Sequence, residues 1–183
     1  MTEKKKKHPI KTIKILCSNK YFILITLAFA IIYTSLGLTG GSRIYYAKYV
    51  LGNEMINSTM TLFNYIPTIL TIMLIPIFAK KFGKIKALFV GFLFYGAGLI
   101  LEIAGPVNLP MIYGGLVLQG IGHAALYSCL FAIVGDVVDY SEWKDGIREE
   151  GLTYSVTSFG QKIGTGLGTA ALGWILAAGN YNG

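Results

Sequence analysis

The sequence predicts an all-α polytopic membrane protein, and three observations lead to this fold class. Of the 183 residues, 54% are hydrophobic and 14% are charged, whereas soluble domains carry roughly 25% charged residues. Long apolar runs alternate with short charged segments, and a helix needs about 20 apolar residues to cross about 30 Å of hydrocarbon. Strand-like alternation is absent, so the runs are predicted to be helices that satisfy their own backbone hydrogen bonds in lipid.

The expected spans follow one another along nearly the whole chain. Residues 1–20 form a basic cytoplasmic connector, which lacks the small-residue cleavage site of a signal peptide. Residues 21–183 form a partial transmembrane bundle with five expected spans, at about 21–50, 55–79, 87–104, 109–135 and 152–178. Because five spans that start inside the cell leave the end of the chain outside, we expect that a sixth span is missing and that the chain is part of a larger membrane protein.

Glycine and proline residues predict departures from straight helices in the first two spans. Three glycines in the segment 37–41 precede Arg43, and they predict a bend or a locally unwound turn near the outer third of the first span. Pro67 and Pro76 predict kinks in the second span. For Arg43 two positions are open: the side chain either extends to the outer headgroups or faces an outer vestibule.

Basic residues predict the orientation of the spans. Thirteen of them flank the expected spans on one side, and two, Arg43 and Lys48, lie on the other. By the positive-inside rule, the N-terminus and the 136–150 loop are cytoplasmic in a multi-pass protein of the cell membrane. Glu54 and Glu102 are then expected at the outer surface, in contact with water. The net charge of +7 reflects this topology, so we expect contact with membrane lipid and no nucleic-acid partner.

The loop before the fifth span concentrates acidic residues. It holds six of the nine in the chain: Asp136, Asp139, Glu142, Asp145, Glu149 and Glu150. Their spacing fits neither an EF-hand nor a phosphate-binding loop. We expect gating ion pairs at the cytoplasmic mouth, which form in one conformation and break in another, made by Asp136, Asp139, Glu142, Lys144, Arg148 and Glu149. A Mg²⁺ site and a merely solvated loop are the alternatives.

The fifth expected span has two distinct faces. At 100° per residue, one face gathers the polar residues Ser155, Ser158, Lys162, Thr165 and Thr169. Glycines at positions 160, 164 and 168 lie roughly opposite, where they allow another helix backbone to approach closely. Since a lysine inside lipid costs at least about 2.5–3.5 kcal/mol, Lys162 is predicted to line a wet cavity. The alternative is a side chain that extends to the headgroups.

The fourth expected span carries a second polar stripe. Gln119, His123 and Tyr127 recur every four residues and so share one face. All three are expected to contribute to substrate binding. A hydrogen bond to a neighbouring helix would by itself explain Gln119, and for His123 a satisfied interior histidine is the alternative to a proton carrier. The ring of Tyr127 can stack on the apolar face of a pyranose. No metal-ligand spacing is present, so no metal site is expected, and both Cys17 and Cys129 are expected to be free thiols.

Three segments carry a family resemblance: DVVDYSEWKDGIREEGLTYSVTSFGQKIGTGLG, GGSRIYYAKYVLGN and AKKFGKIKALFVG. They are similar to loop 10–11 with helix 11, to helix 7, and to the loop between helices 8 and 9 of the glycoside–pentoside–hexuronide:cation symporters, a major-facilitator family that includes the melibiose permease. The resemblance implies the C-terminal half of such a transporter, helices 7 to 11, without helix 12. It also implies that Lys162, Thr157 and Ser158 lie at a sugar site, where Tyr127 replaces a tryptophan.

The resemblance implies secondary active transport of a sugar or glycoside by alternating access, with the chain as a fragment of the full transporter. The coupling cation is Na⁺ or H⁺, its site lies mostly in the absent N-terminal half, and no other cofactor is expected. The partners are then the sugar, membrane lipid and the missing half. We expect no enzymatic activity; the alternative is an integral membrane enzyme that uses the acidic loop as a metal site, and a membrane scaffold or receptor would leave the polar stripes unexplained.

Overall fold

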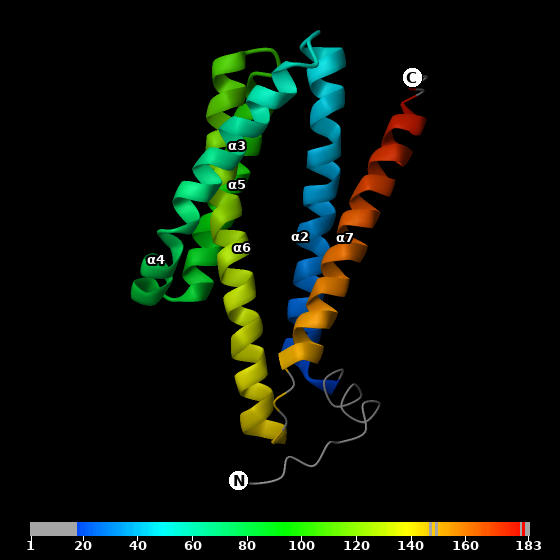
Figure 1. The fold of residues 1–183 in the computed structure, drawn as a ribbon. Helices are drawn as coiled ribbons and strands as arrows, with labels where there is room; N and C mark the ends of the chain where they lie inside the picture. Colours follow the sequence, from blue (N-terminus) through cyan, green and yellow to red (C-terminus); the bar gives the residue numbers. More distant parts are fainter. Residues whose placement is uncertain (1–17, 147, 149, 180, 182–183) are drawn as a thin grey trace. The chain divides into compact units, whose positions relative to one another are not determined.

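The computed structural model describes residues 18–146, 148, 150–179 and 181, and this part of the chain is helical without any strand (Figure 1). The elements in chain order are α2 (Lys20–Tyr45), the π-helix η1 (Tyr46–Val50), α3 (Ile56–Ile72), α4 (Ile75–Phe82), α5 (Lys84–Ala104), α6 (Leu109–Asp145) and α7 (Glu150–Ala178). The predicted all-α class is therefore confirmed.

Three helical segments in the described residues are long and apolar enough to cross a membrane: Lys20–Val50, Lys84–Ala104 and Leu109–Lys144. The pair α3 and α4 makes a fourth if the two are taken as one bent span. The 29 residues of α7 are long enough, but its polar stripe keeps its hydropathy below that of the others. The expected number of five spans is thus not established and stays a prediction.

The second span bends at one of its two prolines. Between α3 and α4 the axis turns by 52°, and Pro76 lies at the start of α4. A proline ring clashes with the carbonyl four residues earlier and offers no N–H, and for Pro76 that carbonyl belongs to Ile72, the last residue of α3. The kink expected at Pro67 does not break the helix, because Pro67 lies inside a continuous α3.

The glycines of the first span do not unwind it, and the bend that was the other expectation stays a prediction. The α2 helix continues through them to Tyr45, and the looser turn comes just afterwards, in η1, where the Leu51 N–H donates to the Tyr46 carbonyl at 3.1 Å. Gly37 serves close packing instead: a Cβ there would lie 2.7 Å from the carbonyl oxygen of Thr165 in α7.

The chain divides into two compact units, and the division falls within α2 and α6. Of the described residues, those up to Leu38 and those from Ile133 onward form one unit, called here the terminal unit, and residues 39–132 form the other, called here the middle unit.

In the terminal unit, the glycine face of α7 packs on the first part of α2 (Figure 1). Added Cβ atoms at Gly164 and Gly168 would collide with the carbonyl oxygens of Ala30 and Thr34, and one at Gly160 would lie 3.1 Å from that of Thr26. All three glycines are buried. The predicted packing face of this helix is confirmed.

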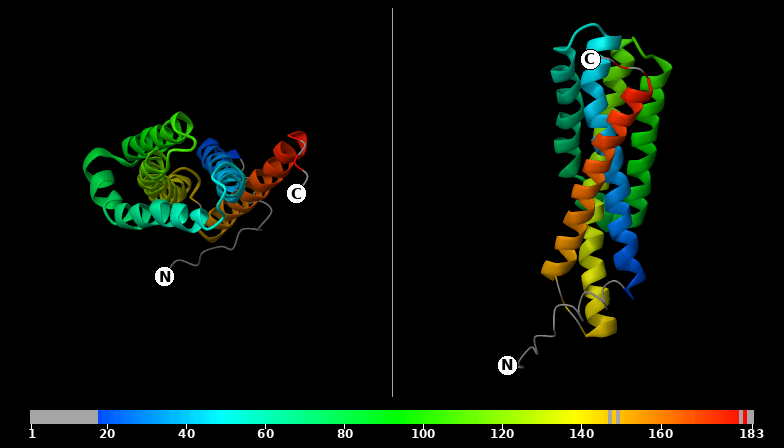
Figure 2. Two further views of the ribbon diagram at one scale, coloured as in Figure 1. Left: turned by 90° about the horizontal axis from the view of Figure 1, so that it is seen from above. Right: turned by 90° about the vertical axis from the view of Figure 1, so that its right-hand side faces the viewer.

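In the middle unit, α3, α4 and α5 lie around the α6 segment, as the view from above shows (Figure 2). Ile112 and Leu116 of α6 are fully buried in this unit. Glycines again set the distance: a Cβ at Gly122 of α6 would lie 2.7 Å from the Gly91 carbonyl oxygen of α5. Helices α5 and α6 therefore approach each other backbone to backbone.

Candidate functional site

An open hollow of about 600 Å³ follows the polar face of α7 in the terminal unit. It is lined by Ser158, Gln161, Lys162, Thr165, Gly166 and Thr169. The hydroxyls of Ser158 and Thr165 donate to carbonyl oxygens one turn earlier, at 2.8 and 3.0 Å, so the oxygen lone pairs remain as acceptors toward the hollow. The face thus combines hydroxyl acceptors, an amide and one ammonium group.

Lys162 lies beside the middle of a helical segment that is long and apolar enough to cross a membrane. The neighbouring Gly160 and Gly164 pack against the segment Thr26–Tyr33 of α2, which belongs to the apolar span Lys20–Val50. The side chain of Lys162 is exposed on the opposite face. The predicted polar stripe therefore exists as one continuous face; its role in binding stays a prediction.

The structure separates Thr157 from this face, although the resemblance grouped it with Ser158. Thr157 is fully buried, on the same side of α7 as Gly160 and Gly164. Its hydroxyl donates to the Tyr154 carbonyl oxygen at 2.9 Å. Consecutive residues of a helix differ by 100°, so Ser158 faces the hollow while Thr157 faces α2. Thr157 does not line the site in this arrangement.

The polar stripe of α6 is buried inside the middle unit. Gln119 and His123 are 1% and 5% exposed. The His123 ring lies between two tyrosines, with centroids 5.0 Å from Tyr95 and 5.8 Å from Tyr127. Arg43 donates from Nη2 to the Oε1 atom of Gln119 at 3.0 Å. The three stripe residues share a face, as predicted, but Gln119 and His123 pack against other helices, and no contact with a substrate is shown for them.

Arg43 and Glu102 both lie partly buried in the middle unit. The Arg43 guanidinium bonds to Gln119, and which of the two open positions it takes stays a prediction. Glu102 was expected in water, but its Oε1 atom is buried. The sequence did hold a signal for this cluster: in α5 each of two glycines, Gly91 and Gly98, is followed four residues later by a polar residue.

The acidic segment forms an ion-pair cluster around Arg148. The guanidinium lies 3.2 Å from Asp139, 2.6 Å from Glu142 and 2.6 Å from Glu150. Hydrogen bonds to Glu142 and Glu150 raise the pKa of Arg148 above its ordinary value. The cluster joins the end of α6 to the start of α7, and Arg148 fills the place between the carboxylates that a metal would need.

The remaining predicted gating residues are less fully described. Asp136 is exposed on α6, and the Lys144 ammonium lies 5.9 Å from the Tyr140 ring centroid. Glu149 and the side chain of Asp145 lie outside the described residues. Within the described residues, no group of three His, Cys, Asp or Glu side chains is placed to hold a metal ion. Whether the ion pairs act as a gate stays a prediction.

A buried side-chain hydrogen bond that the sequence did not reveal lies in the terminal unit, close to the Arg148 ion pairs. The amide of Asn19 donates to the Ser141 hydroxyl at 3.0 Å, although the two residues are 122 positions apart. The Asn19 Oδ1 atom also accepts from the Tyr21 N–H at 3.0 Å, which caps α2. The start of α2 is thereby fixed to the end of α6.

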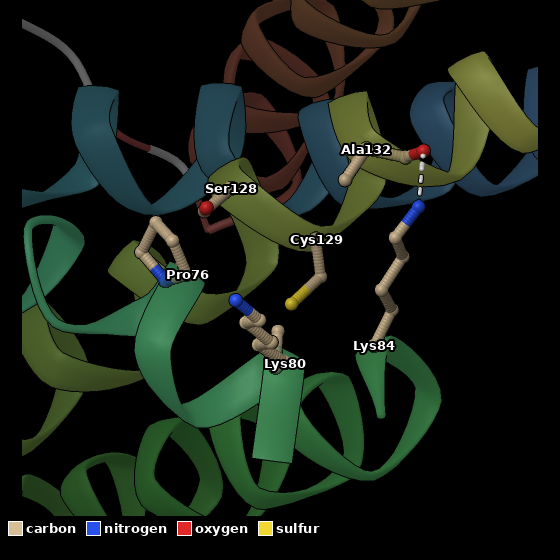
Figure 3. A pocket seen from close by; sticks show the side chains of 7 residues that line it. Pro76, Lys80, Lys84, Ser128, Cys129 and Ala132 are labelled. Carbon is tan, nitrogen blue, oxygen red and sulfur yellow. Dashed lines mark hydrogen bonds between the residues drawn. The ribbon is translucent and has the colours of Figure 1, made fainter. Parts of the chain in front are cut away.

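A second hollow, of about 360 Å³, lies in the middle unit among α4, α5 and α6 (Figure 3). Lys84 donates from Nζ to the Ala132 carbonyl oxygen at 3.1 Å, and Cys129 is a buried free thiol beside it. Lys80 points toward the same space (Figure 3). Cys17, the other expected free thiol, lies outside the described residues.

Comparison with known proteins adds relatives to this geometry. The chain is 30% identical over 182 residues to the isoprimeverose transporter of Lactiplantibacillus pentosus. The aligned region covers 98% of this chain and 38% of that protein. It is 30% identical over 142 residues to the glucuronide carrier protein homolog of Escherichia coli (strain K12), 76% of this chain and 31% of that protein. It is 26% identical over 164 residues to the raffinose carrier protein of Pediococcus pentosaceus, 88% of this chain and 25% of that protein.

The chain spans less than half the length of these relatives, and no solved structure matches it significantly. Residues 1–183 as a whole match the family described as MFS/sugar transport protein. The apolar helices, the match along the full chain and the relatives named as transporters and carriers agree, and they confirm the resemblance noted in three segments of the sequence. The chain is a membrane protein that belongs to the MFS/sugar transport protein family.

Proposed function

We propose that the chain is the C-terminal part of a transporter that moves a sugar or glycoside across the cell membrane by alternating access, coupled to Na⁺ or H⁺. The observation that carries this proposal is Lys162, an ammonium group on an open polar face at the depth of the α2 span. A charge at that depth is costly in lipid. The face therefore requires a wet cavity, and a cavity of hydroxyls, an amide and one cation suits a polyhydroxylated substrate.

The relatives support a sugar as cargo. They are named for isoprimeverose, a glucuronide and raffinose, and each is much longer than this chain. In the proposed transporter, the other half supplies the wall opposite Lys162 and Ser158. The Arg148 ion pairs then lie at the cytoplasmic mouth and stabilise one facing state. The proposed orientation is supported by the excess of basic residues on one side.

The test is uptake by the complete transporter in vesicles, with labelled isoprimeverose, a glucuronide and raffinose as the sugar panel. Lys162→Ala is expected to lower concentrative uptake by roughly tenfold or more, because a cavity-lining charge acts in binding or coupling. Lys162→Arg is expected to restore only part of it, since a planar guanidinium does not replace a compact, strongly hydrated ammonium.

The matched control is Lys20→Ala, which removes an exposed lysine at the start of α2 and is expected to leave uptake unchanged. Membrane yield of each variant is measured alongside. Normal uptake by Lys162→Ala, with unchanged dependence on the cation, would contradict the assignment of this face to the substrate.

A further inference from the structure

The hollow among α4, α5 and α6 lies at one end of a segment that can span a membrane (Figure 3). Lys84, which lines it, is the first residue of α5. The 21 residues of α5 extend about 31 Å at 1.5 Å per residue, which matches the hydrocarbon layer of a bilayer. The Lys84 end of the hollow is therefore expected at the level of the lipid headgroups, on the side that the basic residues predict to be cytoplasmic.

The lining of the hollow combines an apolar wall with two ammonium groups. The side chains that line it are those of Pro76, Ala79, Lys80, Lys84, Ser128, Cys129 and Ala132. Lys80 points into the space from α4, and Lys84 reaches across it to the Ala132 carbonyl oxygen (Figure 3). An ammonium group has three N–H donors, so Lys84 can bind an anion while it keeps this bond.

The chain around the hollow carries an excess of positive charge. The segment 80–86 holds four lysines, and the chain has no acidic residue between Glu54 and Glu102. Within the described residues, the exposed Lys80 forms no ion pair. The first carboxylate of α6 is Asp136, and its single charge balances at most one of the four lysines. The hollow therefore favours an occupant with a negative charge.

Exposed apolar surface continues from the hollow along α4. Ile77 is 70% exposed and lies three residues before Lys80, on the same side of the helix. Pro76, four residues before Lys80, lines the hollow itself. Because α4 leads from the bend toward the lysines, Pro76 and Ile77 lie deeper in the expected membrane than the ammonium group of Lys80. An acyl chain on Pro76 and Ile77 would cover this surface while the phosphate of the same lipid reaches Lys80.

The size of the hollow limits which part of a lipid it can hold. Its volume of about 360 Å³ lies at the small end of the range of ligand pockets, about 300–1,000 Å³. This is room for a phosphate group with its glycerol and the start of one acyl chain, and the rest of the tails would stay in the bilayer.

We propose that this hollow binds an anionic phospholipid of the predicted cytoplasmic leaflet. Lys80 and Lys84 hold the phosphate, and the start of one acyl chain lies on Pro76, Ile77 and Cys129. A zwitterionic lipid also has a phosphate, but its cationic headgroup would add a further positive charge beside the four lysines. The site requires only that the chain lies in a membrane, so it does not depend on the proposed transport function.

The first experiment measures lipid selectivity with the 183-residue chain in detergent. The chain is mixed with equal amounts of phosphatidylglycerol and phosphatidylcholine that have the same acyl chains, and native mass spectrometry counts the lipids that it retains. Phosphatidylglycerol is expected to be retained in roughly fivefold excess or more, because one well-placed lysine contributes about that factor at an anionic headgroup. Equal retention of the two lipids would overturn the proposal.

Two neighbouring lysines provide a matched pair of variants. Lys80→Gln is expected to lower the retention of phosphatidylglycerol by roughly fivefold, because this side chain points into the hollow. Lys81→Gln removes the same charge from the next residue, which is also exposed but does not line the hollow, and should change retention by less than about twofold. Equal losses would show a general attraction to the basic segment and, like an unchanged Lys80→Gln, would overturn the site.

The last measurements separate a lipid from a soluble anion and locate it. Inorganic phosphate at the concentration of the lipid should not displace phosphatidylglycerol, since phosphate gains nothing from the apolar wall; displacement would overturn the lipid assignment. Phosphatidylglycerol with a photoreactive diazirine near the start of one acyl chain should cross-link to peptides that contain residues 76–80 or 128–132. Cross-links confined to other segments would overturn the location.

Discussion

Arg148 is the residue with the densest set of charged contacts in the described chain. Its three carboxylate partners come from the end of α6 and the start of α7, and all four side chains are exposed. Because hydrogen bonds to Glu142 and Glu150 raise the pKa of Arg148, the guanidinium keeps its proton at any pH suitable for handling the protein. The cluster can respond to pH only through its carboxylates, and salt will screen it.

Replacement of Arg148 by Ala is expected to loosen the junction between α6 and α7. Three neighbouring carboxylates would then repel one another without a cation between them, so backbone amides of residues 139–152 should exchange hydrogen faster in the variant. Hydrogen exchange with mass spectrometry measures this, and high salt should reduce the difference. Lys144→Ala is the control, since that ammonium lies over the Tyr140 ring. Equal exchange in the two variants would mean that Arg148 does not hold the junction.

At the scale of single residues, the sequence predicted some positions and missed others for a physical reason. Lys162 was predictable because charge is rare in an apolar helix. The Asn19–Ser141 hydrogen bond was not, because it joins positions 122 residues apart that only the packing of α2 and α6 brings together. The surroundings of Glu102 were not predicted for the same reason. Its position near a helix end suggested contact with water, whereas the facing Gly115 leaves room for its side chain inside the unit.

At the scale of helices, periodicity predicts which residues share a face but not which helix covers that face. The glycine face of α7 was predicted to pack, and it packs on α2. The close contact of α5 with α6 at matching glycines was not predicted, because glycine spacing alone does not say which helix covers it. Pro67 and Pro76 look equivalent in the sequence, yet the 52° bend between two helices lies just before Pro76, whereas Pro67 lies inside a continuous α3.

Gly164→Leu should destabilise the packing of α7 on α2 by about 1–3 kcal/mol or more, the usual cost of overfilling a close contact. Even a methyl group at Gly164 would collide with the Ala30 carbonyl oxygen. The melting temperature and membrane yield of the chain in detergent measure the effect. Gly166→Leu is a matched control two positions away, because a Cβ at Gly166 meets nothing within 4 Å. Equal losses in both variants would show that the α7 contact with α2 is not the cause.

At the scale of the whole molecule, the sequence predicted the class and the family, while the number of spans remains open. Charge and length define a span when a helix is apolar throughout, as in α5. The same criteria do not count α7, because its polar stripe lowers its hydropathy, although the helix packs along α2. Composition alone would underestimate any span whose polar face lines a wet cavity.

The two ends of α5 offer the sharpest test of orientation. This helix has 21 residues, about 31 Å at 1.5 Å per residue, so its ends must lie on opposite sides of the membrane if it spans. In a chain with Cys17→Ser and Cys129→Ala, a membrane-impermeant maleimide should reach Lys86→Cys only from the cytoplasmic side and Val107→Cys only from outside. Both positions are exposed, so burial does not limit the reaction. Labelling in the reverse sense would mean that the positive-inside argument fails for this chain, and labelling of both from one side would exclude α5 as a span.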